Sequence, residues 1–116
     1  MGERFLIVGR LSTGDTSGIA RLFQVSDATE LPSVLGVRRR HLFSYADLYF
    51  HYVEFAGDRD DALRRAATRP DFRQLSAQLA DHVRPYDPAT WRSPADAIAT
   101  EFYGWQAAPT GPEVVP

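Results

Sequence analysis

A segment of twenty residues near the middle of the chain carries most of the side chains that could do chemistry. Residues 36–55 read GVRRRHLFSYADLYFHYVEF and contain three consecutive arginines, two histidines and six aromatic residues. The pattern predicts a β-hairpin whose turn lies at residues 45–48. Strands that only fill a core do not need so many cationic groups. These side chains therefore form a solvated face, a nucleic-acid patch or the lining of a reaction pocket.

The register of this hairpin decides which polar groups can meet. A turn of even length at residues 45–48 places Leu42 opposite His51. The same register places Arg40 opposite Val53, so Arg40 and His51 are diagonal neighbours, ~7–8 Å apart at the backbone. Alternation groups eight residues on one face of the hairpin: Arg38, Arg40, Leu42, Ser44, Tyr49, His51, Val53 and Phe55. A turn of odd length would break this arrangement.

Each of these polar groups also has a plainer interpretation. Arg38 and Arg39 are typical of solvent-facing strand residues. A histidine among aromatic residues on a strand, such as His51, is more often a satisfied core residue than a base. Arg40 and Tyr49 on the same face make a reactive site an equally good interpretation. Both stay open at this point.

Three further polar residues lie outside this group. Asp27 falls near the end of a predicted helix, where the helix dipole disfavours an acid. It is therefore either a loop cap or a group kept for chemistry. His41 is expected at a sheet edge or a contact between two copies, and His82 at the surface. The three histidines do not have the spacing of metal ligands, so we expect no metal site.

The composition excludes several classes of function. The 116 residues include no cysteine, so disulfides and a cysteine nucleophile are excluded. All 13 basic residues are arginine, which removes lysine Schiff-base chemistry. The net charge of −2 gives no general attraction to nucleic acid or to an anionic membrane. No signal peptide or membrane span is recognisable, so we expect a cytoplasmic protein.

The elements are predicted in the order strand, helix, two strands, helix, strand. The first strand covers residues 4–11, and the helix after it is capped by Asp15 or Thr16 and ends before Leu31-Pro32. The hairpin strands extend from about Val34 to about Phe55. The second helical region is interrupted by one proline and carries an apolar stripe: Phe72, Leu75, Leu79 and Val83. The final strand is placed in residues 95–105.

This order predicts an α+β fold with a ferredoxin-like four-stranded antiparallel sheet and helices on one face. The opposite face of the sheet also carries apolar residues, so we expect a second copy to cover it. The result would be a homodimer of the dimeric α/β barrel type. Residues 1–106 are expected to form one domain and residues 107–116 a flexible, proline-rich tail.

Four short motifs in combination carry a resemblance to a known family. They are Glu30-Leu31-Pro32, Gly36-Val37-Arg38-Arg39-Arg40, Asp47-Leu48-Tyr49 with His51, and Phe102-Tyr103. With them the chain resembles the tetracenomycin-type aromatic polyketide cyclases from about Arg4 to Trp105. The resemblance implies a homodimer with a pocket between sheet and helices. It also implies cofactor-free aldol cyclisation and aromatisation of a poly-β-keto intermediate, received from an acyl carrier protein or a minimal type II synthase.

The resemblance also assigns roles to residues. The family's strand arginine corresponds to Arg40, its strand histidine to His51 and its helix acid to Asp27; its helix histidine is replaced by Ser26. In this hypothesis His51 transfers a proton, Arg40 holds an enolate oxygen, and Asp27 orients or acts as a second acid or base. The expected pocket lining is Tyr49, Ser26, Leu42, Phe23 and Val53.

Two other functions stay open on the sequence. One is a cofactor-independent monooxygenase that oxidises anthrones on a similar fold. The other is a non-catalytic module that shields a reactive polyketide within a synthase complex. Fold alone does not separate these from a cyclase, because one fold serves many activities.

Overall fold

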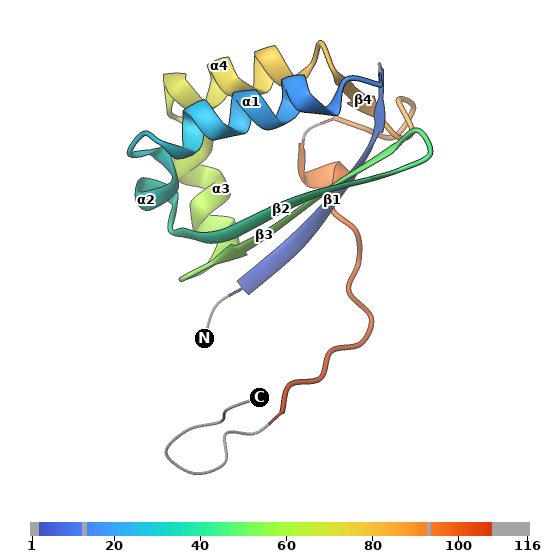
Figure 1. Cartoon of the computed structure of the whole chain (residues 1–116). Coiled ribbons are helices and arrows are strands. Elements are labelled where there is room, and N and C mark those ends of the chain that lie inside the picture. Colours follow the sequence, from blue (N-terminus) through green and yellow to red (C-terminus); the bar gives the residue numbers. More distant parts are fainter. Residues whose placement is uncertain (1–2, 13, 93, 108–116) are drawn as a thin grey trace.

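The protein is a four-stranded antiparallel sheet with its helices packed on one face (Figure 1). The computed structural model describes residues 3–12, 14–92 and 94–107. The elements in chain order are β1 (Glu3–Leu11), α1 (Thr16–Asp27), α2 (Leu31–Leu35), β2 (Val37–Tyr45), β3 (Leu48–Phe55), α3 (Arg59–Ala67), α4 (Pro70–Leu79), β4 (Val83–Pro85) and the 3-10 helix η1 (Pro94–Ala97). The strand order is β2-β3-β1-β4, which confirms the ferredoxin-like α+β fold.

The β2–β3 hairpin has the predicted register over most of its length. Leu42 pairs with His51 and Arg40 pairs with Val53 across a two-residue turn. A β-bulge between Val37 and Arg39 then shifts the register. Continued without a bulge, the predicted register would pair Arg38 with Phe55. In the structure Val37 takes the position opposite Phe55 and packs on the core. The bulge lets the apolar side chain turn inward and leaves Arg38 in solvent.

The segment between α1 and β2 differs from its prediction. Residues 31–35 form the short helix α2, and β2 starts at Val37, not near Val34. Pro32 lies in the first turn of α2, where a missing N–H costs nothing. Gly36 then ends the helix in the left-handed conformation with φ 77°. The α1 helix ends at Asp27, before Leu31-Pro32 as predicted. Its start is also capped as predicted, since Asp15 accepts a hydrogen bond from the Gly18 N–H.

The last strand is not where the sequence placed it. β4 is only three residues long and includes Val83, which pairs with Leu11 and so does not continue the α4 helix. Residues 95–105 are not a strand, although Ile98 makes one isolated bridge to Ile7. The edge of β1 that does not pair with β3 is thus shared by β4 and the bridge at Ile98. Neither segment is long enough to show a periodic pattern in the sequence. The predicted tail lies outside the described residues except for Ala107.

The core fills the space between the sheet and the helices in three clusters. One joins α1 to the sheet through Ile19, Phe23 and Tyr49. A second packs Val53 and its strand neighbours against α3, and a third joins α2 to α3. The first cluster lies directly beneath the polar groups of the hairpin, so it is the part of the core that positions them.

The opposite face of the sheet lies away from α1–α4 (Figure 1) and carries apolar side chains. Phe43 is 57% exposed and Tyr45 75% exposed. By alternation, Leu6, Val8, Leu48, Phe50 and Tyr52 share this face and are half-buried. We call this set the open face. Among the described residues, no helix is long and apolar enough to cross a membrane.

Candidate active site

Arg40 is the centre of a polar cluster between the sheet and α1. Its Nε and Nη2 donate hydrogen bonds to the two carboxylate oxygens of Asp27, at 3.1 and 2.8 Å. Its Nη1 lies 2.9 Å from Nε2 of His51. The Arg40 side chain is only 16% exposed, while that of Asp27 is 38% exposed. The structure therefore brings together the three residues predicted to be catalytic.

The proton arrangement on His51 follows from its partner. A guanidinium can only donate, so Nε2 of His51 must accept and its proton must lie on Nδ1. Burial, and then the positive charge of Arg40, lowers the pKa of His51 from 6.5 to about 3. His51 is therefore a neutral imidazole at physiological pH.

Aromatic side chains surround the cation and the imidazole. The guanidinium of Arg40 lies over the ring of Phe23, 4.8 Å from its centroid, which is a cation–π contact. The Phe23 ring is 5.0 Å from that of His51, and the Tyr49 ring is 6.5 Å away on the same strand. Burial raises the pKa of the Tyr49 phenol, so it remains protonated. The cluster thus combines one cation, neutral donors and apolar walls.

Asp27 is explained by this cluster. It is the last residue of α1, where the dipole disfavours an acid, and the bidentate bond to Arg40 offsets that cost. Phe23 and Asp27 are four residues apart, so they lie on the same face of α1. Sequence reasoning missed the contact of Phe23 with Arg40, although this spacing was the signal that could have revealed it.

The remaining predicted lining residues are placed less uniformly. Leu42 packs against the core cluster that contains Phe23 and Tyr49. Ser26 precedes Asp27 at the end of α1, half-buried, and its carbonyl accepts hydrogen bonds from the backbone and hydroxyl of Thr29. Val53 is 2% exposed. It is enclosed by the second core cluster and is therefore a core residue rather than part of a pocket wall.

Two other polar residues of β2, Arg39 and His41, lie on the open face. His41 stacks on Tyr52, and Arg39 pairs with Glu54 at 3.8 Å. His82 was expected at the surface, but it is half-buried and its Nδ1 is buried without a hydrogen-bond partner among the described residues. Within the residues that the structure describes, no three histidine or acidic side chains are grouped as a metal ion would require.

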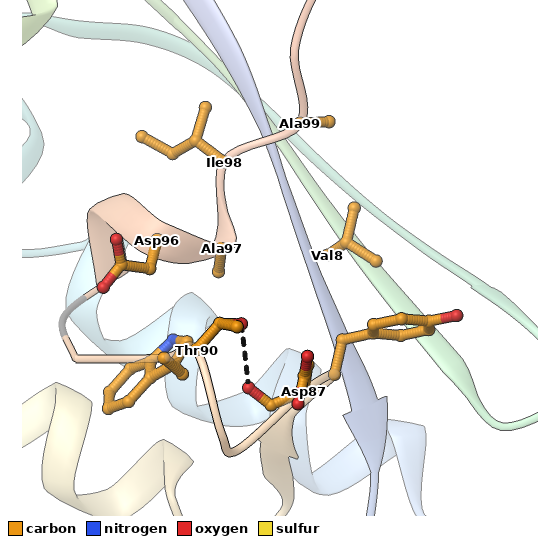
Figure 2. A pocket seen from close by; sticks show the side chains of 9 residues that line it. Val8, Asp87, Thr90, Asp96, Ala97, Ile98 and Ala99 are labelled. Atoms are coloured by element: carbon orange, nitrogen blue, oxygen red, sulfur yellow. Dashed lines mark hydrogen bonds between the residues drawn. The ribbon is translucent and has the colours of Figure 1, made fainter.

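Two hollows in the structure lie away from the Arg40 cluster. One, of about 240 Å³, lies between Val8 of β1 and two segments, residues 86–91 and 96–99 (Figure 2). Trp91 forms part of its wall. The other, of about 700 Å³, lies between Arg4 and Glu54 of the sheet and Trp105. Neither is lined by a residue of the Arg40 cluster, so these two hollows do not coincide with the polar cluster.

The fold and site define a small α+β protein of ferredoxin-like topology with a cationic, aromatic-lined cluster beneath its first helix. The family model of polyketide synthesis cyclases matches residues 3–106. The chain belongs to this family and is a polyketide cyclase. The resemblance inferred from the hairpin motifs is thereby confirmed.

Relatives along the whole chain agree with this assignment. An uncharacterized protein of Streptomyces coelicolor is 45% identical over 91% of this chain and 96% of its own length. Tetracenomycin F2 cyclase of Streptomyces glaucescens is 36% identical over 92% of this chain and 97% of its own length. The solved structure of that cyclase, described as a type II polyketide cyclase, has a TM-score of 0.83 and covers 91% of this chain and 99% of the solved one. The polyketide synthase CurG of Streptomyces cyaneus is 39% identical over 87% of this chain and 94% of its own length.

Proposed function

We propose that this protein closes a ring in a poly-β-keto intermediate of type II aromatic polyketide synthesis without a cofactor. A carbon between two carbonyls loses a proton and forms a C–C bond to a second carbonyl carbon of the same chain. The alkoxide that results takes up a proton, and loss of this hydroxyl as water completes the aromatic ring. No electron is gained or lost in these steps, so no oxidant or reductant is needed.

The observation that carries this proposal is the held guanidinium of Arg40. The reaction develops negative charge on oxygen, first as an enolate and then as an alkoxide. A cation fixed by Asp27 and His51 can stabilise that charge without having to reorganise. The carbon acid is already activated by its two carbonyls, so the barrier is reduced mainly by holding the chain in a reactive fold. In the best intramolecular cases such positioning supplies ~7–11 kcal/mol.

The reaction is tested by reconstitution with a minimal type II polyketide synthase that makes a linear poly-β-keto chain. Wild-type protein is expected to shift the products toward one cyclised aromatic compound. Arg40→Gln is expected to lose that shift, because the carboxamide is neutral and lacks the fork of donors. Arg39→Gln is the matched control, since Arg39 pairs with Glu54 on the open face. Identical products with and without wild-type protein would refute the proposal.

Two measurements, oxygen uptake and the products of the same reconstitution, separate the two other functions. A monooxygenase would consume oxygen when supplied with an anthrone, and oxygen uptake is measured directly. A non-catalytic binding module would protect the linear chain without selecting a ring, and it would tolerate Arg40→Gln. The substrate is expected to arrive on an acyl carrier protein or from the synthase itself. The cytoplasmic location expected from the sequence remains a prediction.

We also propose that the protein is a homodimer in which two copies pack open face to open face. Phe43 and Tyr45 leave large aromatic surface in water in the single chain. Burying apolar area of this kind stabilises by ~25 cal/mol per Å². A two-fold axis would bring the same patch of both copies together. Packing at the open face would not cover the Arg40 cluster, because that cluster lies on the opposite side of the sheet.

A further inference from the structure

We infer that His51 and Asp27 are positioning residues that clamp Arg40 from two sides, and that Arg40 presents its remaining N–H groups to both oxygens of a 1,3-dicarbonyl enolate. This inference rests on the proposed cyclase function and deepens it by naming the chemical group that the site recognises. It also assigns His51 a different role from the proton transfer expected from the sequence. The steps that support it follow from hydrogen-bond directions.

The first step is the donor count on Arg40. A guanidinium has five N–H groups. One on Nε and one on Nη2 are directed to Asp27, and one on Nη1 is directed to His51. Among the contacts of the described residues, one N–H on Nη1 and one on Nη2 therefore remain. These two groups lie on neighbouring nitrogens of a rigid plane. We place His51 on the Nη1 hydrogen nearer Cδ, so that the outer hydrogens of Nη1 and Nη2 are parallel and can bind two oxygens at once.

The second step is the state of His51. Its Nε2 lone pair is directed at the Arg40 N–H, so it is not available to remove a proton from a substrate while this bond exists. Protonation of Nε2 would place an N–H against a cationic donor. Among the described residues, the ring and charged groups in contact with this imidazole are Arg40 of β2, Phe23 of α1 and Tyr49 of β3, and none of these three is an anion. The nearby acid, Asp27, is bonded to Arg40.

The third step is the match between the fork and the substrate class. The enolate of a 1,3-dicarbonyl spreads one negative charge over two oxygens that lie on the same side of the carbon between them. A planar fork of donors recognises such a pair as it recognises a carboxylate. Phe23 places an apolar ring against the guanidinium, which suits the carbon skeleton of the ligand. Binding in this manner favours the enolate over the neutral diketone, and that form is the nucleophile of the cyclisation.

The test uses a simple probe, benzoylacetone, an aromatic 1,3-diketone whose enolate and neutral forms differ in ultraviolet absorbance. Wild-type protein is expected to lower the apparent pKa of the bound probe in an absorbance titration. Arg40→Lys keeps the charge but loses the fork, so we expect the probe to bind about tenfold more weakly or worse. Arg39→Lys is the control and should leave the titration unchanged.

Two substitutions of His51 separate positioning from proton transfer. His51→Gln supplies a carbonyl oxygen that can accept the Arg40 N–H, so probe binding is expected to stay within about threefold of wild type. His51→Leu removes the acceptor, and binding is expected to fall about tenfold. Thermal unfolding of each variant checks that it folds, and Arg40→Gln replaces Arg40→Lys if the latter does not.

Two results would overturn the inference. One is that His51→Gln loses binding as completely as His51→Leu, which would require an imidazole rather than an acceptor. The other is that wild-type protein binds the probe without favouring its enolate, or that Arg40→Lys binds the enolate as tightly as wild-type protein does. Neither measurement needs a synthase or turnover, so the inference can fail while cyclisation succeeds. Equally, probe binding as expected alongside unchanged synthase products would refute only the proposed cyclisation.

Discussion

Three consecutive arginines of one strand have three different environments in this protein. Arg38 lies at the β-bulge, and Arg39 reaches across the open face to Glu54. Only Arg40 is turned toward the helices, where it is largely removed from water. A cation there needs partners, because an unpaired buried charge costs several kcal/mol. Asp27 supplies the balancing negative charge, and His51 supplies a second hydrogen-bond acceptor.

The low pKa of His51 has a consequence for stability. Burial, with the Arg40 charge as a second cause, lowers this pKa from 6.5 to about 3. Below pH 6.5 the unfolded chain therefore binds a proton that the folded chain does not, and stability falls as the pH falls. Between pH 7 and pH 5 we expect wild-type protein to lose ~2 kcal/mol more unfolding free energy than His51→Gln. Urea unfolding at one fixed protein concentration measures this difference.

A matched control for this experiment is His41→Gln on the open face. It leaves His51 in place, so it should keep the wild-type dependence on pH. If His51→Gln and wild-type protein lose the same stability on acidification, the imidazole is not held neutral in the fold. The difference reports on His51 alone, because all three proteins have the same carboxylates and the effects of these on the pH dependence of stability cancel.

At the scale of elements, the shortest strand depends on a glycine. β4 has three residues and pairs with β1 at Gly9, Arg10 and Leu11. A Cβ at Gly9 would lie 2.9 Å from Cγ1 of Val83 and 3.2 Å from the carbonyl oxygen of Arg84. We therefore expect Gly9→Ala to displace β4 and to lower the unfolding free energy by about 1–3 kcal/mol. Denaturant unfolding gives the value.

Gly57→Ala is the control, since a Cβ there meets nothing within 4 Å. Its effect should stay within about 0.5 kcal/mol. Faster amide hydrogen exchange at Leu11 in Gly9→Ala would locate the loss in the β1–β4 pairing. Equal stability of the two variants would mean that β4 does not depend on the close approach.

The elements also show what the sequence could and could not predict. The pairing of Leu42 with His51 was predictable because a two-residue turn and alternation determine it. The bulge at Arg38 was not, because it depends on Val37 reaching a core that only the tertiary fold creates. β4 is too short for any periodic pattern. The unfavourable position of Asp27 at a helix end was readable from the sequence. Its place beside Arg40 came only from the family resemblance, since Arg40 lies thirteen residues away on another element.

At the scale of the whole molecule, the segment after η1 leaves the body of the protein (Figure 1). Its aromatic side chains are exposed. It first follows β1, where the Ala99 N–H donates to the Leu6 carbonyl at 2.7 Å. Arg4 then holds Glu101 at 2.9 Å. Beyond this anchor, the aromatic residues are among the most exposed of the described chain: Phe102 at 95%, Tyr103 at 75% and Trp105 at 76%.

We expect these aromatic residues to contact the second copy in the proposed homodimer. A buried aromatic side chain contributes ~1.5–3 kcal/mol, so replacing Phe102 and Trp105 together by serine should weaken dimerisation about tenfold or more. Sedimentation equilibrium measures the dissociation constant. Trp91→Ser is the matched control, because Trp91 belongs to the hollow beside residues 86–99 of its own chain.

Fluorescence gives an independent check of the same contact. The chain has two tryptophans, so Trp91→Phe leaves Trp105 as the single reporter. If Trp105 packs on the partner, its emission should move to shorter wavelength as the protein concentration rises through the dissociation constant. A dimer whose Trp105 emission stays at the wavelength of a solvated indole would show that Trp105 does not contact the partner. A stable monomer at micromolar concentration would contradict the homodimer itself, since the open face would then remain in water.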